Sequence, residues 1–466
     1  MSESVPEPLP PPGAWAPARR VLRKVLAPVE RFLAIEASSG VVLLVMGAVA
    51  LAWANSPFAG RYHALWHTPL GFTLGGFGFE KDLHFWVNDG LMTVFFFVVG
   101  LEIRREVNKG ELESLRRAAL PLAAALGGML VPALIYLAFN AGSASSRGWG
   151  IPMATDIAFA VGALALLGKR VPPAMRILLL ALAVMDDVGA IVVIALFYSQ
   201  GLEPTGFGLM GLGVAAVFAL QATGARRSWV YLAPGAVVWA GALVAGVHPA
   251  LAGVVVGLLT PTRVWFTQQR FLEEVDAHLA DLRSAEPLRE QDLLPHLAAL
   301  EVARREAVSP VERLQHVLHP WVAYGVMPLF ALANAGVPLG AATFEGEGLR
   351  AFLGVAVGLA VGKPLGVFLV AKGAARVGLV TVPKGLSSRH LGVVGLAAGI
   401  GFTMAIFIAT LAFPPGPLLE TAKLGVLTGT AAAGVLSWVV GRLALEPELA
   451  AGAARTEAEA EASDAA

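Results

Sequence analysis

The sequence contains no cysteine and comparatively little charge. The absence of cysteine excludes disulfide bonds, thiolate metal sites and cysteine nucleophiles. Charged residues make up 15% of the 466 residues, whereas a soluble domain usually has about 25%. The 34 basic residues balance the 34 acidic ones, so bulk electrostatics give no reason to expect a nucleic-acid partner.

Apolar residues account for 56% of the chain, and the mean hydropathy is +0.68. They form long blocks, and a helix needs about 20 such residues to cross a bilayer. We therefore predict an all-α polytopic membrane protein with twelve transmembrane helices. The predicted spans are residues 37–55, 84–104, 117–139, 152–168, 173–198, 205–222, 229–245, 247–260, 318–338, 351–371, 391–412 and 419–442.

The basic residues predict how these helices are oriented. With the N-terminus in the cytoplasm, the cytoplasmic loops hold 28 Lys and Arg and the external loops hold four. Because cytoplasmic loops are rich in Lys and Arg, we expect both termini in the cytoplasm. Residues 1–34 form a Pro-rich and basic segment without the apolar core of a signal peptide, residues 35–445 the transmembrane domain, and residues 446–466 a disordered acidic tail.

Two loops of the transmembrane domain are expected to be structured. Residues 56–82 contain GFTLGGFGFE, where Gly75 and Gly76 separate two short apolar and aromatic runs. That pattern indicates a β-hairpin outside the membrane. Residues 262–314 form a long charged cytoplasmic insert. Its stretch FLEEVDAHLADLRSAE has leucines and charges at helical spacing, so we expect an amphipathic surface helix there.

Four ionisable residues lie deep inside predicted spans: Asp156, Asp186, Asp187 and Lys363. A charge at the centre of a transmembrane helix costs about 2.5–3.5 kcal/mol on insertion scales. Four uncompensated charges would cost on the order of 10–14 kcal/mol, which is comparable to the whole stability of a typical fold. These groups must pair, take up protons or face water, so they are the candidates for a functional site.

Asp186 and Asp187 are adjacent within the apolar stretch ALAVMDDVGAIVVIALFYS. Neighbouring residues on an α-helix point about 100° apart. The two carboxylates therefore border one cavity from two directions, without the face-to-face geometry that an intramembrane aspartyl protease needs. Carboxylates that are close together and removed from water titrate as a coupled set. We predict that the pair binds a cation and carries protons; a water-exposed helix end is the alternative.

Thr155 and Asp156 interrupt the first half of the short fourth span. This predicts a broken helix whose positive N-terminal end is compensated by Asp156; the alternative is a helix that begins at the outer surface. Lys363 is flanked by Gly362 and Pro364, which predicts a counter-ion on a locally kinked helix. A lysine that reaches the membrane interface is the alternative for this residue.

A second interruption is predicted in residues 390–413, where Gly399, Gly401 and Thr403 lie in mid-span. A broken helix in each half of the chain is typical of inverted-repeat transporters, which bind ions at the membrane midplane. Close packing of helices through glycine is the alternative.

Motifs found in one order from about Ile35 to Arg442 resemble the bacterial NhaA sodium/proton antiporters. They are WVNDGLMTVFFFVVGLEIRRE, ATDIAFAVGALALLG, ALAVMDDVGAIVVIALFY, GVHPALAGVVVG, HVLHPWVAY, FALANAGV, GKPLG and GIGFTMAIFIA. The resemblance implies inverted-topology repeats formed by helices 3–5 and 10–12. It also implies that helices 4 and 11 are the broken ones and cross at the midplane.

The same resemblance implies electrogenic, pH-regulated exchange of one Na⁺, or Li⁺, for two H⁺ across the bacterial inner membrane. The protein would be a transporter and not an enzyme. Na⁺ and H⁺ would be its substrates, and no cofactor, catalytic residue or structural metal is expected. Its partners would be membrane lipid and a second copy bound through the hairpin at residues 68–80. A sodium-coupled symporter of an organic anion on the same broken-helix fold is the alternative.

The resemblance also implies a role for each of these residues. Asp187 would be the main Na⁺ ligand. Asp186 would join it in proton exchange and would pair with Lys363 when the site is empty. Thr155 would line the site. Asp156 and Lys363 would compensate the charges of the helix ends.

The pH response of the family involves acidic and basic residues at the inner end of helix 2, to which Glu102, Arg105 and Glu106 correspond. Ordinary ion pairs at a solvated helix end are the alternative. At the start of helix 9 this chain has Gln315 where the family usually has Glu, and glutamine cannot lose a proton. Glu312, nearly one turn earlier, would substitute only if the geometry allows.

Two further residues lie near the outer half of the protein. His248 matches a histidine that influences the pH response in the family; a loop histidine with satisfied hydrogen bonds is the alternative. Asp89 is expected either to cap the start of the second span or to border an outer funnel.

Overall fold

The computed structural model describes most of the chain and is dominated by helices. The described residues are 38–74, 77–110, 112–199, 201–225, 227–284, 290–383 and 385–446. The predicted N-terminal segment 1–34, residues 75–76 of the predicted hairpin and residues 447–466 of the predicted tail lie outside them.

Eight of the described helices are long and apolar enough to cross a membrane. The number reaches eleven when each of three bent helix pairs counts as one span. This confirms an α-helical polytopic membrane protein. The predicted number of twelve stays a prediction, because the eighth predicted span corresponds to α11 (Ala250–Leu259), an apolar helix of only 10 residues.

The elements of the first half follow one another with short connections. They are α2 (Ser38–Ala54), α3 (Ala59–Trp66), β1 (Pro69–Leu74), β2 (Phe77–Asp82), α4 (Leu83–Phe85), α5 (Met92–Lys109), α6 (Leu115–Asn140), α7 (Ile157–Ala165), α8 (Pro173–Phe197), α9 (Pro204–Ala222), α10 (Leu232–Ala245) and α11. A π-helical turn at Trp86–Leu91 joins α4 to α5, and a 3₁₀ helix at Ala144–Met153 precedes α7.

The second half begins with a helical pair outside the bundle and returns to it. Its elements are α12 (Gln268–Ser284), α13 (Glu290–Ala307), α14 (Pro310–Trp321), α15 (Met327–Asn334), α16 (Gly346–Val357), α17 (Lys363–Arg376), α18 (Ser388–Ala398), α19 (Phe402–Ala412) and α20 (Pro417–Ala444). π-helical turns at Val322–Val326 and Gly358–Gly362 join α14 to α15 and α16 to α17.

The two predicted helix breaks are present in the structure. The 3₁₀ helix Ala144–Met153 and α7 meet at a bend of 47°, and α18 and α19 meet at a bend of 49°. Residues 154–156 and 399–401 form the breaks. The backbone groups freed there need partners, because no water competes for them in the bilayer core.

The helix α8 is continuous through the aspartate doublet. Pro173 stands at its first position, where a missing N–H costs nothing. The apolar residues on one face of the helix pack inside the bundle. Leu179, Leu182 and Ala183 are at most 1% exposed. The doublet therefore lies inside the bundle and not at a helix end.

Glycines bring two pairs of helices into backbone contact. A Cβ atom added to Gly127 of α6 would lie 2.2 Å from the carbonyl oxygen of Gly366 of α17. Likewise, a Cβ atom on Gly257 of α11 would lie 2.9 Å from Cα of Gly100 in α5. Neither contact leaves room for a side chain, so glycine here serves close helix packing.

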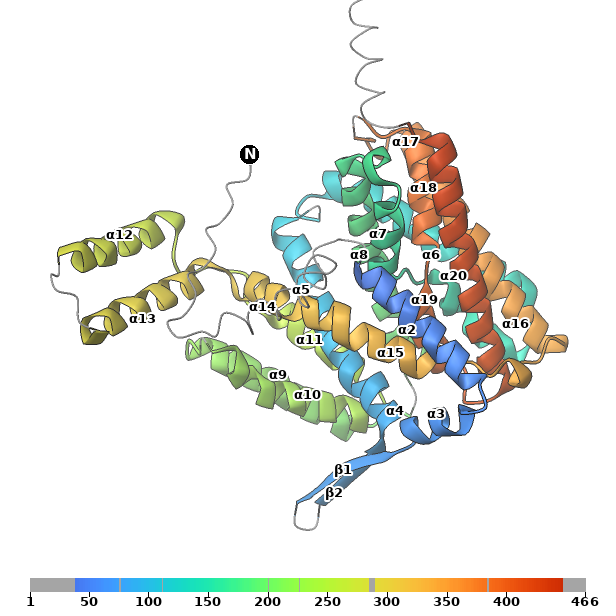
Figure 1. The fold of residues 1–466 in the computed structure, drawn as a ribbon, viewed down its shortest axis with the longest axis horizontal. Helices are drawn as coiled ribbons and strands as arrows, with labels where there is room; N and C mark the ends of the chain where they lie inside the picture. The colour runs from blue at the N-terminus through green and yellow to red at the C-terminus, as the bar shows by residue number, and fades with distance from the viewer. Residues whose placement is uncertain are drawn as a thin grey trace, which may run out of the picture.

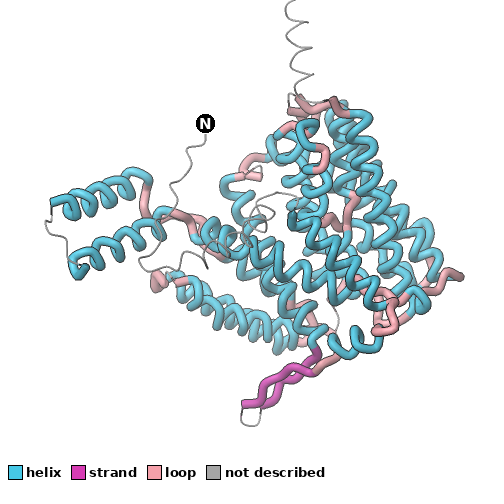
Figure 2. Tube along the Cα trace, viewed as in Figure 1, coloured by secondary structure: helices cyan, strands magenta, loops and turns pink. Residues whose placement is uncertain are grey.

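A two-stranded hairpin projects from one end of the bundle (Figure 1). Strands β1 and β2 pair antiparallel, from Pro69 opposite Asp82 to Leu74 opposite Phe77. They are the only strands among the described residues, as the colouring of Figure 2 makes clear. The predicted hairpin is thus confirmed over the residues that the structure describes.

The insert differs from its prediction in two ways. The amphipathic helix is present as α12, but a second helix, α13, packs beside it, and the pair lies away from the bundle (Figure 1). The next span begins at Pro310 and not at 318. Ser309 caps it by accepting a hydrogen bond from the N–H of Glu312, and Pro310 fits the first helical position. Gln315 consequently lies inside the helix.

Candidate functional site

The two helix breaks lie against each other at the centre of the bundle. The backbone N–H of Asp156 donates to the carbonyl oxygen of Ile400 at 2.7 Å. The hydroxyl of Thr155 donates to the carbonyl oxygen of Ala398 at 3.0 Å. Segments more than 240 residues apart in the chain thus satisfy each other's freed backbone groups.

Asp156 caps two helices with one carboxylate. Its Oδ1 accepts from the N–H of Phe159 in the first turn of α7 at 3.1 Å. Its Oδ2 accepts from the N–H and the hydroxyl of Thr403 in the first turn of α19, at 3.2 and 2.5 Å. Helix N-termini carry partial positive charge, and Asp156 is 1% exposed. Its carboxylate therefore lies beside two helix N-termini, whereas the sequence led us to expect one.

Lys363 lies beside the opposite kind of helix end. Its Nζ donates to the carbonyl oxygen of Met153, the last residue of the 3₁₀ helix, and lies 2.7 Å from Oδ2 of Asp186. The lysine is fully buried. A π-helical turn directly precedes the lysine. Pro364 has no N–H to donate to the preceding turn, and the π-helical turn accommodates it there. Such turns are frequent at functional sites.

Asp186 has one satisfied oxygen and one unsatisfied oxygen. Its Oδ2 accepts from Lys363 and, at 2.6 Å, from the hydroxyl of Thr155. Its Oδ1 is buried and has no hydrogen-bond partner among the described residues. The single proton of the Thr155 hydroxyl thus has two acceptors, Asp186 and Ala398.

Asp187 is 2% exposed, and no hydrogen bond or ion pair holds its carboxylate within the part of the chain that the structure describes. Burying an unpaired charge is costly, so this carboxyl group requires either a proton or a cation. Together the carboxylates, the Thr155 hydroxyl and the nearby carbonyl groups offer only oxygen ligands. Such a set suits a hard cation.

Three of the residues expected to mediate the pH response lie in the second half of α5. Arg105 and Glu106 form an ion pair at 3.0 Å. Glu102 lies one turn earlier, between Val99 and Ile103, which pack against Val184 of α8. The helix face that carries Glu102 therefore approaches the helix that carries the aspartate doublet.

Gln315 is 9% exposed on α14. Glu312, on the first turn of the same helix, lies 3.3 Å from Nζ of Lys109 at the end of α5. This ion pair connects α14 to the end of α5.

Asp89 and His248, for which the sequence left two roles each, lie close together in the structure. Asp82, and not Asp89, caps the second span by accepting from the N–H of Phe85 at 2.8 Å. Asp89 lies about two turns further along the chain, where its Oδ1 is 3.4 Å from Nε2 of His248. The prediction of Asp89 as a cap was wrong because Asp82 already occupies that position. His248 also contacts the ring of Phe407, with centroids 5.1 Å apart.

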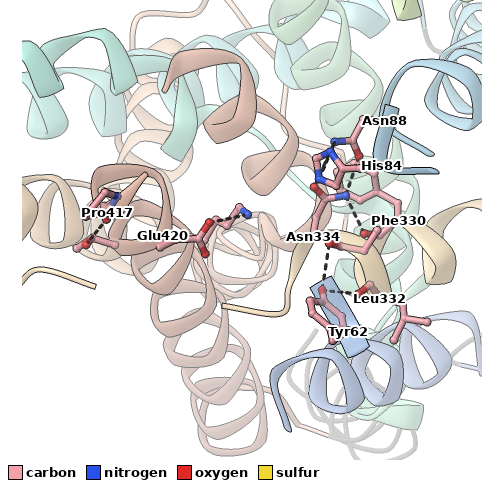
Figure 3. Close-up of polar contacts among 11 residues, drawn as sticks. Tyr62, His84, Asn88, Phe330, Leu332, Asn334, Pro417 and Glu420 are labelled. Carbon is pink, nitrogen blue, oxygen red and sulfur yellow. Dashed lines mark hydrogen bonds and ion pairs between the residues drawn. The ribbon is translucent and has the colours of Figure 1, made fainter. Parts of the chain in front are cut away.

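A polar cluster near the hairpin was not predicted from the sequence. Asn334 at the end of α15 donates to Oδ1 of Asn88 at 2.7 Å, and His84 lies 3.3 Å from the same asparagine (Figure 3). Tyr62 donates to the carbonyl oxygen of Leu332 at 2.8 Å. Asparagine and tyrosine do not interrupt an apolar run as an aspartate does, so the sequence alone gave no reason to select them.

The comparisons with known proteins agree with this geometry. A family model described as Na⁺/H⁺ antiporter 1 matches residues 30–440. The chain is 57% identical to Na⁺/H⁺ antiporter NhaA 2 of Sorangium cellulosum, over 97% of each chain. It is 55% identical to Na⁺/H⁺ antiporter NhaA 2 of Myxococcus xanthus, over 98% of this chain and 97% of that one. For Na⁺/H⁺ antiporter NhaA of Bordetella petrii the identity is 50%, over 96% and 97%.

Proposed function

This chain belongs to the NhaA family of Na⁺/H⁺ antiporters, and we propose that it expels one Na⁺ or Li⁺ in exchange for two protons. Exchange takes place by alternating access to the site formed by Asp186, Asp187 and Thr155. The transporter works in the bacterial inner membrane with both termini in the cytoplasm. It needs no cofactor, since both substrates are simple ions.

The observation that carries the proposal is the different pairing of the two adjacent aspartates. Asp186 is neutralised by Lys363 at 2.7 Å, whereas Asp187 is buried without such a partner. In the sodium-free site Asp187 therefore holds a proton. An arriving Na⁺ displaces that proton and competes with Lys363 for Asp186, so the ion and the protons occupy the same pocket in turn.

The charge balance of this pocket makes the exchange electrogenic. Two protons leave it, one from Asp187 and one from the Lys363 ammonium, and one Na⁺ enters. The loaded site then carries one positive charge fewer than the protonated site. A membrane potential that is negative inside acts on this difference, by about 2.3 kcal/mol per charge for each 100 mV.

Thr155 assists the replacement of protons by Na⁺. Its hydroxyl reaches both Oδ2 of Asp186, at 2.6 Å, and the carbonyl oxygen of Ala398, at 3.0 Å. When Na⁺ binds Asp186, the hydroxyl donates to Ala398 and turns a lone pair towards the ion. The hydrogen bond is kept while a ligand is gained.

The pH response involves the inner end of α5 and the outer pair of His248 and Asp89. Glu102, Arg105 and Glu106 lie on the helix that packs against α8, which places charge changes close to the doublet. Gln315 replaces an ionisable residue, and the ion pair of Glu312 with Lys109 takes over its connection between α14 and α5.

A second copy of the chain binds through the hairpin at residues 68–80. The hairpin projects from the bundle (Figure 1), and strand edges without partners are ready to pair. The predicted inverted repeats are supported by the two broken helices with similar bends, 47° and 49°.

The test uses everted membrane vesicles from a strain without its own Na⁺/H⁺ antiporters. Respiration acidifies the vesicles, and a fluorescent probe reports the pH gradient. Addition of Na⁺ or Li⁺ should dissipate the gradient, and K⁺ should not. Asp187→Asn should abolish the response. Asp276→Asn, which removes an exposed aspartate from α12, should leave it intact.

Two further measurements test the choice between antiport and symport and the number of protons exchanged. A gradient that collapses only when an organic anion accompanies Na⁺ would identify a symporter. Proteoliposomes with an imposed K⁺-valinomycin potential test the stoichiometry, because a rate independent of the potential contradicts two protons per Na⁺.

A further inference from the structure

The helical pair α12–α13 takes no part in the transport mechanism described above. It follows α11 and precedes α14, and it lies outside the bundle (Figure 1). Several of its leucines are 38–67% exposed: Leu272, Leu279, Leu294 and Leu297. Two helices that bury so little apolar surface gain little from packing alone.

Three side chains with metal-ligand chemistry converge between these two helices. His278 and Asp281 are three residues apart on α12 and therefore share one face. His296 of α13 faces them, and its Nδ1 lies 3.0 Å from Nδ1 of His278. One ligand atom from each of the three residues lies within 4.8 Å of the others.

The separation of the two imidazole nitrogens fits a small transition-metal ion, and the exposed Asp281 is close enough to join them. Ligand atoms at 2.0–2.1 Å from a tetrahedral zinc ion lie about 3.3 Å from one another, close to the separation of the two imidazole nitrogens. Imidazole and carboxylate together favour Zn²⁺ and its neighbours in the first transition row over Mg²⁺ or Ca²⁺. Both histidines are half-buried and Asp281 is exposed, so an ion can enter from the solvent.

We propose that His278, Asp281 and His296 bind one divalent transition-metal ion of the Zn²⁺ class, with water as the fourth ligand. The sequence predicted no structural metal, because the two histidines are 18 positions apart and conform to no familiar ligand spacing. Only the antiparallel packing of α12 and α13 brings them together. The ion joins the two helices across their connection and stabilises the pair in place of an apolar core.

The experiment measures binding of Zn²⁺ alone to the purified full-length protein in detergent, carrying an affinity tag free of histidine. Calorimetric titration should give one saturable site per chain. Co²⁺ should give visible absorption bands whose intensity reports a four-coordinate site. His296→Gln keeps the size and polarity of the side chain and should weaken binding by more than about tenfold, since even loss of an outer partner of a ligand costs 10–100-fold.

The controls separate this site from other histidines and carboxylates. His63→Ala removes an exposed histidine of α3, and Asp276→Asn removes an exposed carboxylate of α12; neither should change the Zn²⁺ affinity. Absence of a saturable site overturns the proposal, as does equal affinity in the wild type and in the His278→Gln/His296→Gln double variant. The titration measures metal binding without transport. A negative result would therefore not contradict the proposed antiport mechanism, and a failure of the vesicle assay would not contradict the metal site.

Discussion

Replacement of Asp156 by alanine should destabilise the protein through two helices at once. The carboxylate accepts three hydrogen bonds, one from Phe159 and two from Thr403. Loss of a single N-cap costs about 1 kcal/mol, and each buried donor left unpaired adds about 1–3 kcal/mol. Relief of the buried charge offsets part of this sum. We expect a net loss of about 3 kcal/mol.

The assay is thermal melting of the purified protein in detergent. About 3 kcal/mol corresponds to a Tm lowered by roughly 6 °C, at about 2 °C per kcal/mol for large domains. Asp82→Ala is the matched control, because Asp82 caps one helix through one hydrogen bond near the outer surface. It should lower the Tm by only about 2 °C.

The Asp156→Asn variant separates charge from hydrogen bonding. Its side-chain oxygen can still accept from Phe159, but its amide group cannot accept from the N–H of Thr403. Its melting temperature should fall between those of the wild type and Asp156→Ala. If Asp156→Ala melts within about 2 °C of the wild type, or above Asp82→Ala, one carboxylate does not stabilise both helix ends and the reasoning fails.

Other substitutions test the remaining parts of the site. Lys363→Ala leaves the charge of Asp186 buried without its partner and should cost about 3–5 kcal/mol; adding Asp186→Asn should recover most of the Tm, and an unchanged melting curve for the single variant would contradict the ion pair. Thr155→Val keeps the shape of the side chain but removes a ligand, so the KM for Na⁺ in vesicles should rise several-fold, and an unaltered KM would exclude the hydroxyl from the site. Gln315→Glu restores an ionisable group on α14 and should move the pH at which transport activates. If the pH profile of that variant superimposes on that of the wild type, Gln315 has no part in the response.

The functional residues could be predicted where charge interrupts an apolar run. Asp156, Asp186, Asp187 and Lys363 stand out because each would be too costly in hydrocarbon without a partner. Asparagine side chains are neutral and do not stand out from an apolar run in this way. Asn88 and Asn334 therefore went unnoticed, although they form a buried pair across the bundle.

The partners of these residues could not be predicted from one sequence. Asp156 and Thr403 are separated by 247 positions, and nothing local in either segment indicates the other. The predicted start of α14 was wrong for a different reason. Ser309, Pro310 and Glu312 form a recognisable capping pattern for the start of α14. They lie in the charged insert, however, outside the apolar run from which the span is predicted.

The backbone contact between Gly127 and Gly366 limits how Lys363 can move during the transport cycle. A screw movement of α17 against α6 by one residue, which combines a rise of about 1.5 Å with a rotation of about 100°, would press Leu365 or Val367 into a space that admits no side chain. We therefore expect Lys363 to move together with α6 as one unit. The helices α5 and α11, joined by their own glycine contact, form a second such unit, which touches α8 through the side chains of Val99, Ile103 and Val184. We therefore expect the two units to move relative to each other at this side-chain contact between α5 and α8, close to Asp186 and Asp187.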